Sequence, residues 1–449
     1  MLKITFLGAG STVFAKNILG DALLTPSLRE AEIALYDIDA GRLEDSFLMM
    51  NTLNATINSD RGRGRARVTK HLGVAARKEA LRGATFVVNA VQVGGYEPST
   101  AIDFDIPKKY GLRQTIADTL GIGGIFRGLR TVPVMMDIAR EMEEACPEAW
   151  LLNYTNPMAI VTGGLLRGSS VKTVGLCHSV QVCARTLLED VGLEVSEADL
   201  NWKIAGINHM AWLLEISERG RDLYPEIKKS AAALNAAARA PGGTKHGDMI
   251  RLEIMRHFGY YITESSEHNA EYTPYWIKRD RPDLIEEFNI PLDEYPRRCV
   301  KQIADWRQRR DAIVSAPSLT HEKTHEFGSF IMDAMVTGTP YRIHGNVLNR
   351  GLIPNLNADA VVEVPCLVDR NGIQGCYAGP LPTQCAALNM TSVNVHLLAV
   401  EAALTGKRDL VYQAAFLDPH ASAELTLDQI RSLCDDMFEA HGNIMPEFK

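Results

Sequence analysis

The chain has 449 residues, of which 46% are hydrophobic and 23% are charged, and its formal net charge is -8. This length fits one large two-lobed enzyme or two to three ordinary domains, and the composition is that of a soluble globular protein. The acidic balance, with no cluster of lysine and arginine, excludes a nucleic-acid surface, and no apolar stretch reaches the length of a membrane span.

The cysteines and the first residues of the chain indicate a location. The 8 cysteines follow no disulfide spacing and include no C-x-x-C pair. Nothing at the N-terminus resembles a signal peptide, because the first three residues lead directly into a strand. We therefore expect reduced thiols, a cytoplasmic protein and no membrane partner.

The first forty residues have the pattern of a dinucleotide-binding fold. We expect a buried strand over 2–7, a glycine turn over 8–12, a helix over 13–23 and a second strand over 32–37 that ends on an acid. Glycines let the backbone approach a pyrophosphate on the helix N-terminus, and a carboxylate accepts hydrogen bonds from a ribose diol, which favours NAD over NADP. The expected cofactor-binding residues are Gly8, Gly10, Ser11, Thr12 and Asp37.

The glycine motif is imperfect, because Val13 stands at the third glycine position. The alternative is a tight strand-to-helix turn that needs glycine only for its backbone dihedral angles. Strands and helices continue to alternate after it, with loops expected over 114–118 and over the glycine-rich residues 121–127, and a long amphipathic helix at about 129–145. This alternation predicts an α/β fold with a Rossmann-like, doubly wound parallel sheet up to about residue 195.

Beyond Gly206 the alternation loosens. We expect a mobile surface segment over 231–243, strand-like segments over 345–365 and closing helices over 389–403 and 426–440. Residues 260–275 are rich in aromatic and acidic side chains, which suits a sugar pocket but is more often a solvated rim. The simplest account is a NAD-binding domain over 1–200 and a second mixed α/β lobe over 201–449 that covers the ligand edge of the sheet.

Two residues could bind a metal ion. Cys177 follows a β-branched strand and precedes a helix, and a thiol at a helix N-terminus ionises readily and suits a soft metal ligand. His209 is a second ligand of the right type. Taken alone, the two are more simply interpreted as a small buried hydrophobe and a hydrogen-bonded core histidine.

Five separated motifs change that balance, since together they resemble glycoside hydrolase family 4. They are Gly8-Ala-Gly-Ser-Thr, Val93-Gly-Gly-Tyr, Asn153-Tyr-Thr-Asn-Pro, Gly175-Leu-Cys-His-Ser and Gly206-Ile-Asn-His. Members of this family are NAD- and divalent-metal-dependent glycosidases, which do not use the usual pair of carboxylates. The amino-acid sequences of several motifs most resemble those of the melibiase-type α-galactosidases of the family.

The resemblance assigns roles residue by residue. It implies that Cys177 and His209 hold the metal, usually manganese, and that Asn156 contacts sugar and metal with Asn153 in the same motif. His178 matches the acid beside the metal cysteine, and Asp118 matches the acid near the catalytic base.

The identity of the base is open. Where some members of the family have an aspartate, this chain has Ser265. Other members use a tyrosine, so Tyr260 and Tyr261 are the expected candidates, and the acids of the run from Glu264 to Glu267 are next in line.

The resemblance also implies a reaction. The sugar is oxidised at carbon 3 by hydride transfer to NAD, the proton on carbon 2 is removed, the aglycone leaves, water adds and the hydride returns, with the metal as Lewis acid. We expect hydrolysis of a non-phosphorylated α-galactoside such as melibiose, by a homo-oligomer (a dimer or tetramer). The alternatives are an α-glucosidase or α-galacturonidase of the same family and, less favoured, a plain NAD-dependent dehydrogenase.

A phosphate on the sugar is disfavoured by charge. A phosphate dianion needs cationic partners, and residues 97–103 contain two acids and no lysine or arginine. The same acids disfavour a uronate, although Arg297, Arg298 or Lys301 could approach from the second lobe. The choice of galactose over glucose depends on the family resemblance alone.

Overall fold

The computed structural model describes residues 2–59 and 66–449. One sheet runs through the described part of the chain, and along its main path the strand order is β10-β8-β7-β12-β11-β6-β5-β4-β1-β2-β3, with β9 paired to β8 and β13 to β12. The strands are β1 (Lys3–Leu7), β2 (Glu32–Asp37), β3 (Arg67–Leu72), β4 (Phe86–Asn89), β5 (Trp150–Asn153), β6 (Lys172–Gly175), β7 (Leu200–Ile207), β8 (Met210–Glu218), β9 (Arg221–Asp222), β10 (Tyr261–Ile262), β11 (Tyr341–Leu348), β12 (Val361–Asp369) and β13 (Gly372–Gly375).

The N-terminal half of this sheet confirms the predicted Rossmann-like fold. Its strands lie in the order β3-β2-β1-β4-β5-β6, and every neighbouring pair among them is parallel. Strands β1 and β4 are buried along their whole length, as expected for apolar strands covered on both faces. Ligands of such sheets bind at the carboxyl ends of the strands, where the candidate residues lie.

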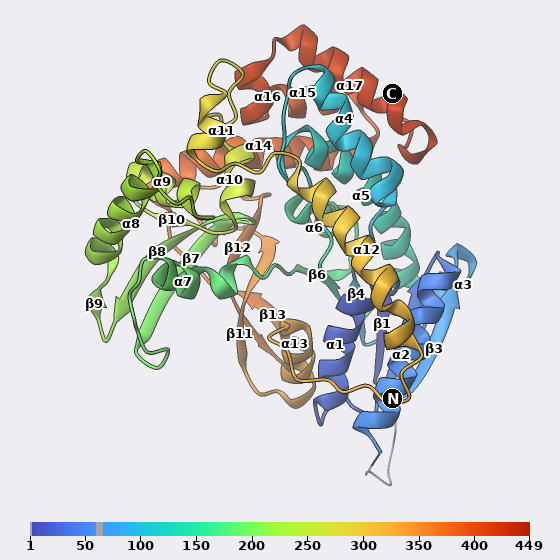
Figure 1. Ribbon diagram of the computed structural model, residues 1–449. Helices are drawn as coiled ribbons and strands as arrows, with labels where there is room; N and C mark the ends of the chain where they lie inside the picture. The colour runs from blue at the N-terminus through green and yellow to red at the C-terminus, as the bar shows by residue number, and fades with distance from the viewer. Residues whose placement is uncertain (1, 60–65) are drawn as a thin grey trace.

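The C-terminal half extends the same sheet with antiparallel strands. Asn346 of β11 pairs with Gly175 of β6, and Glu363 of β12 pairs with Gly206 of β7. The green hairpin of β7 and β8 lies at the far edge from the blue N-terminal strands (Figure 1). The proposed division at residue 200 stays a prediction, since the sheet is continuous across it.

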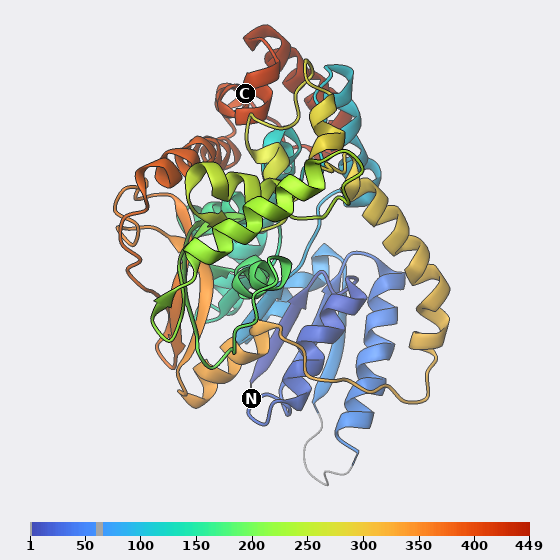
Figure 2. The same ribbon diagram turned by 60° about the vertical axis from the view of Figure 1, so that its left-hand side comes forward.

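Helices cover the sheet and gather at one end of the molecule. Helices α14 to α17, in orange and red, lie beside α4 and α5, while α12 runs diagonally and contacts α2 and η1 (Figures 1 and 2). The helices are α1 (Thr12–Leu24), α2 (Ala40–Ile57), α3 (Val74–Leu81), η1 (Gly95–Thr100), α4 (Ala101–Lys109), α5 (Gly121–Ala145), α6 (Met158–Gly168), α7 (Ser179–Asp190), α8 (Tyr224–Arg239), α9 (Met249–Phe258), α10 (Ser266–Tyr272), α11 (Asp283–Glu287), α12 (Glu294–Val314), α13 (Phe327–Thr337), α14 (Thr383–Thr405), α15 (Arg408–Leu417), α16 (Pro419–Glu424), α17 (Leu427–His441) and η2 (Gly442–Ile444).

The glycine-rich start of α5 was expected to be a loop, and that expectation is wrong. The helix begins at Gly121. A Cβ at Gly123 would lie 2.7 Å from the carbonyl oxygen of Ala117, and one at Gly124 would lie 2.6 Å from the carbonyl carbon of Thr119. The glycines therefore allow close packing of a helix against the preceding loop, rather than breaking the helix.

Most of the alanine-rich segment over 231–243, which was expected to be mobile, is also regular. Residues from Tyr224 to Arg239 form α8, with Ala231 and Ala238 among its buried residues. Alanine has the highest intrinsic helix propensity, and here it also packs against the fold.

One further expectation needs correction. Within the described residues, α14 (Thr383–Thr405) has the length and apolar composition of a membrane span. Of the 18-residue apolar window in this helix, 50% is buried inside the fold, where α14 packs on α5, α6 and α15. A core helix passes the same test, so the indication is weak.

Candidate active site

The glycine turn after β1 lies at the carboxyl edge of the parallel strands. Gly8 has a φ of +81°, and a Cβ there would lie 2.7 Å from the carbonyl oxygen of Ala90. The N–H of Gly10 donates to Asp37 Oδ2 over 2.6 Å. Val13 is 59% exposed, so the third glycine of the usual motif is not needed here for helix packing.

The remaining expected nucleotide residues support the turn. Ser11 Oγ donates to the carbonyl of Gly8 over 2.9 Å, and the buried Thr12 Oγ1 lies 3.3 Å from the carbonyl of Gly10. Beside Asp37, three large apolar side chains are exposed at the ends of β2 and β3: Ile38, Leu72 and Val74. Exposed apolar side chains beside the expected ribose ligand are a feature of interaction sites.

The two expected metal ligands come together at the neighbouring part of the sheet edge. Cys177 lies in the loop between β6 and α7, and His209 lies in the two-residue turn between β7 and β8 with a φ of +63°. Their ligand atoms and a carboxylate oxygen of Glu264 all lie within 4.8 Å of one another. His209 is buried, whereas Cys177 and Glu264 are partly exposed, so the cluster is open on one side.

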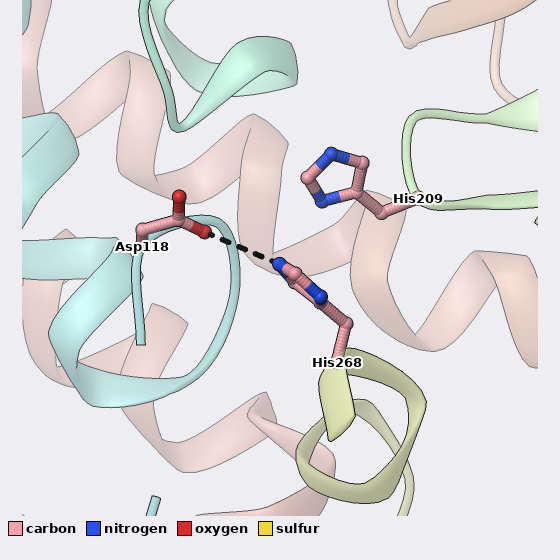
Figure 3. A group of neighbouring side chains, drawn as sticks. All are labelled: Asp118, His209 and His268. Carbon is pink, nitrogen blue, oxygen red and sulfur yellow. Dashed lines mark ion pairs between the residues drawn. The ribbon is translucent and has the colours of Figure 1, made fainter. Parts of the chain in front are cut away.

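A second group of donors shares His209. The ligand atoms of Asp118, His209 and His268 also lie within 4.8 Å of one another, and their side chains converge from three different elements (Figure 3). His268 Nε2 lies 3.9 Å from Asp118 Oδ1. Within each group, the residues lie more than thirty positions apart along the chain.

The electrostatics of this cluster favour a cation. Burial alone would lower the pKa of His209, but the negative charges of Glu264, Cys177 and Asp118 raise the pKa to about 10. Burial would raise the pKa of Glu264, but the facing His209 and His268 hold that pKa below its ordinary value. Without a metal the imidazole supplies the positive charge, so metal binding must displace its proton.

The loop that carries Asp118 is fixed from two directions. The Asn156 amide donates to Asp118 Oδ2 over 3.0 Å. Glu271 accepts the backbone N–H groups of Thr115 at 2.7 Å and Ala117 at 2.8 Å, which holds Ala117 at a φ of +52°. Asp118 and Asn156, both expected site residues, therefore lie together beside the histidines.

Two other expected residues have partners of a different kind. Asn153 is buried, and its amide bonds to Asn89, Thr155 and Thr162, which uses all of its donors and acceptors. The His178 ring is about half exposed, with Nε2 2.6 Å from Glu326 Oε2 and the ring stacked on Phe327.

The tyrosine pair expected to supply the base makes contacts outside the cluster. Tyr261 donates its hydroxyl to Asp248 over 2.7 Å, and burial raises its pKa well above 10. Tyr260 packs edge-on against Tyr224. The tyrosine beside the metal-type cluster is Tyr272, whose hydroxyl lies 3.1 Å from His209 Nδ1.

Sequence reasoning named Glu264 only as a secondary candidate for the base, and it did not single out His268 and Tyr272. All three belong to the polar aromatic run over 260–275, which was more readily interpreted as a solvated rim. Within it, Tyr261, Glu271 and Tyr272 are buried. The sequence signal that could have identified them was the high density of acidic and aromatic side chains within 260–275. A solvated rim does not need so many aromatic rings.

A dinucleotide-type turn and a thiol–imidazole–carboxylate cluster thus share one edge of a Rossmann-like sheet. The model of the family 4 glycosyl hydrolases matches residues 3–193, and the model of the family 4 glycosyl hydrolase C-terminal domain matches residues 204–421. The chain belongs to family 4 of the glycosyl hydrolases, which confirms the resemblance found in its motifs.

Individual relatives add detail. The chain is 58% identical to the α-galactosidase of Bacillus subtilis (strain 168) over 449 residues, which is 100% of both chains. Its structure resembles that of the Bacillus subtilis protein lplD, with a TM-score of 0.85, 26% identity and coverage of 97% and 99%. A 6-phospho-α-glucosidase from gut microorganisms, solved with NAD and Mn2+, shares the fold at a TM-score of 0.79, 22% identity and full coverage of both chains.

Proposed function

We propose that the protein is an α-galactosidase that hydrolyses non-phosphorylated α-galactosides such as melibiose, with NAD and Mn2+ as cofactors. The observation that carries this proposal is the 58% identity with an α-galactosidase over the whole length of both chains. The site geometry is compatible with it, because dinucleotide-type and metal-type features lie at one sheet edge.

The residues present fit both cofactors. Gly8 and Gly10 leave room for a pyrophosphate, Ser11 and Thr12 begin the helix, and Asp37 would hold the adenosine ribose. Cys177 and His209 would hold the metal ion, and the partly exposed side of their cluster leaves coordination positions for sugar hydroxyls. When bound, NAD supplies a reversible hydride acceptor and the metal ion supplies a Lewis acid.

The protein's own side chains then position the sugar and move protons. Asn156 would contact the sugar, with its amide oriented by Asp118. His178 would donate a proton to the leaving group, and the carboxylate of Glu326, 2.6 Å from Nε2, orients the ring for that role. Asn153 would act indirectly, because its bonds hold the loop that carries Asn156.

The charges around the site favour an unphosphorylated sugar. Arg298 pairs with Glu294 and Glu267, and Arg297 pairs with Glu294, so both guanidinium groups already have carboxylate partners. The buried Arg127 lies beside the hydroxyl of Tyr295 and close to the charge of Asp118. A phosphate dianion would have to compete with these acids for Arg297 and Arg298.

The proposal also includes a cellular location and an oligomeric state. The protein would act in the reducing cytoplasm, since its 8 cysteines are all unpaired and one of them, Cys177, is needed as a thiolate. It would assemble as a homodimer or homotetramer, as the family resemblance implies.

The proposal is tested by following p-nitrophenol release and NADH absorbance together. A p-nitrophenyl α-galactoside should be cleaved only with both NAD and Mn2+, with no net NADH, because the hydride returns in every turnover. NADH formed in proportion to product would indicate a plain dehydrogenase, and cleavage unaffected by removal of NAD would contradict the cofactor assignment.

A further inference from the structure

Glu264 lies at the centre of the donor cluster but has no role in the proposed function so far. Its Oε2 lies 3.4 Å from Nε2 of His209, and its Oε1 lies 3.4 Å from Nδ1 of His268. Each oxygen of the carboxylate thus faces a different imidazole, which fixes the orientation of the whole group.

We propose that Glu264 is a third protein ligand of the metal ion, so that the ion is held by a thiolate, an imidazole and a carboxylate. This inference rests on the proposed function, in which Cys177 and His209 are the other two ligands. The ligand atoms of the three residues lie within 4.8 Å of one another, as required for donors that share one ion.

Charge supports a third ligand. A divalent ion held by one thiolate and one neutral imidazole would leave a net positive charge on the ion and its ligands, next to the buried His209. The carboxylate of Glu264 brings the ligand set to two negative charges, which balance the ion. A carboxylate oxygen is also a donor that suits Mn2+, whereas thiolate and imidazole favour softer ions.

The backbone supports the same assignment. Both His209 and Glu264 are non-glycine residues with positive φ, +63° and +67°. Such conformations cost free energy and persist where the surrounding structure imposes them, often at ligand sites. Here the two left-handed residues bring Nε2 and Oε2 towards each other from turns that are far apart in the sequence.

The neighbours of these two side chains match the outer contacts of a metal site. Tyr272 lies 3.1 Å from His209 Nδ1, which leaves Nε2 free to bind an ion. Nδ1 of His268 lies 2.7 Å from Ser265 Oγ and 3.4 Å from Glu264 Oε1, so this ring faces Oε1 while Oε2 faces His209. Ligating histidines and carboxylates usually have such second hydrogen-bond partners, which fix tautomer and orientation.

The experiment is a Mn2+ titration of the NAD-free and metal-free protein, followed by the electron paramagnetic resonance signal of unbound Mn2+. We expect Glu264→Gln to raise the Kd for Mn2+ at least about tenfold. The matched control is Glu267→Gln, three residues along, whose carboxylate pairs with Arg298. Its Kd should equal that of the parent, and Cys177→Ser marks the effect of losing a ligand.

The possible outcomes distinguish failure of the third ligand from failure of the proposed metal site. A parent-like Kd for Glu264→Gln with weak binding by Cys177→Ser would overturn the third ligand and leave the metal site intact. Parent-like binding by both variants would overturn the metal site as well. Should Glu264→Gln not fold, a crystal of the parent soaked in Mn2+ decides: an ion bonded to Glu264 Oε2 supports the inference, and an ion bonded only to Cys177 and His209 overturns it.

Discussion

Asn346 and Glu363 lie side by side where the two halves of the sheet join, and the Asn346 amide donates to Glu363 Oε1 over 3.1 Å. Glu363 is fully buried, and its Oε2 has no hydrogen-bond partner among the described residues. The two residues pair through the backbone with Gly175 and Gly206, which precede the metal-type ligands Cys177 and His209. A buried acid thus lies under the cluster.

The titration of Glu363 should affect stability. Burial raises the pKa of Glu363 from 4.5 to about 7. Between these values the unfolded chain loses the Glu363 proton while the folded protein keeps it. The contribution of Glu363 to the free energy of unfolding is therefore fully present below about pH 4.5 and is lost as the pH rises to about 7. Glu363→Gln cannot ionise. Denaturant unfolding should therefore show the parent losing stability relative to the variant across this window, by at most about 3 kcal/mol.

The prediction concerns the difference between the two proteins, so other titrating groups cancel. Parallel stability–pH curves for parent and Glu363→Gln would show that the carboxyl titrates alike in the folded and unfolded states.

The nucleotide assignment predicts a selective loss of affinity. Asp37→Ala removes the carboxylate expected to hold the ribose diol, and it also removes the acceptor of the Gly10 N–H. We expect calorimetry to show NAD binding at least about tenfold weaker, since each lost charged hydrogen bond is worth about 1.5–3 kcal/mol. Discrimination against NADP should fall as well. Asp39→Ala is the control, because Asp39 caps α2 through the N–H of Arg42; an equal loss in that variant would refute a specific role for Asp37.

Tyr272 should tune the metal ligand rather than act as a base. Its hydroxyl faces His209 Nδ1, and burial raises its pKa well above 10. Tyr272→Phe should weaken Mn2+ binding by about tenfold or more, as for other outer partners of metal histidines. Unchanged Mn2+ affinity would mean that the tautomer of His209 is set in another way.

The tyrosine pair predicted from the sequence makes a contrasting case. Because the Tyr261 hydroxyl bonds to Asp248, Tyr261→Phe should leave the exchange of the carbon 2 proton with deuterated solvent at the parent rate. Tyr260→Phe should do the same. Abolished exchange in either variant, measured by mass spectrometry of recovered substrate, would restore that residue as the base.

The fold was predictable from the sequence because its signals are local. Apolar strands, a glycine turn and the acid at the end of β2 follow one another within forty residues, and each predicts its own element. Cys177 and His209 were predictable through family motifs. Asp118 was predictable in the same way. The place of Glu264 in the metal-type cluster was not, because it depends on left-handed backbone conformations in turns, at His209 and at Glu264 itself, which hydrophobic patterns do not encode.

The start of α5 was wrongly predicted because glycine can serve close packing as well as turns. The glycines at the start of α5 indicated a loop, since glycine is a common signal for turns. Their purpose is visible only once the chain from Ala117 to Thr119 lies against that helix.

The most direct test of the account compares initial rates on matched substrates with NAD and Mn2+ present. The substrates are p-nitrophenyl α-galactoside, α-glucoside, α-galacturonide and 6-phospho-α-glucoside. We predict fastest cleavage of the α-galactoside, with loss of activity when Mn2+ is chelated or NAD is removed. Faster cleavage of the 6-phospho-α-glucoside or of the α-galacturonide, or undiminished activity without either cofactor, would contradict the account.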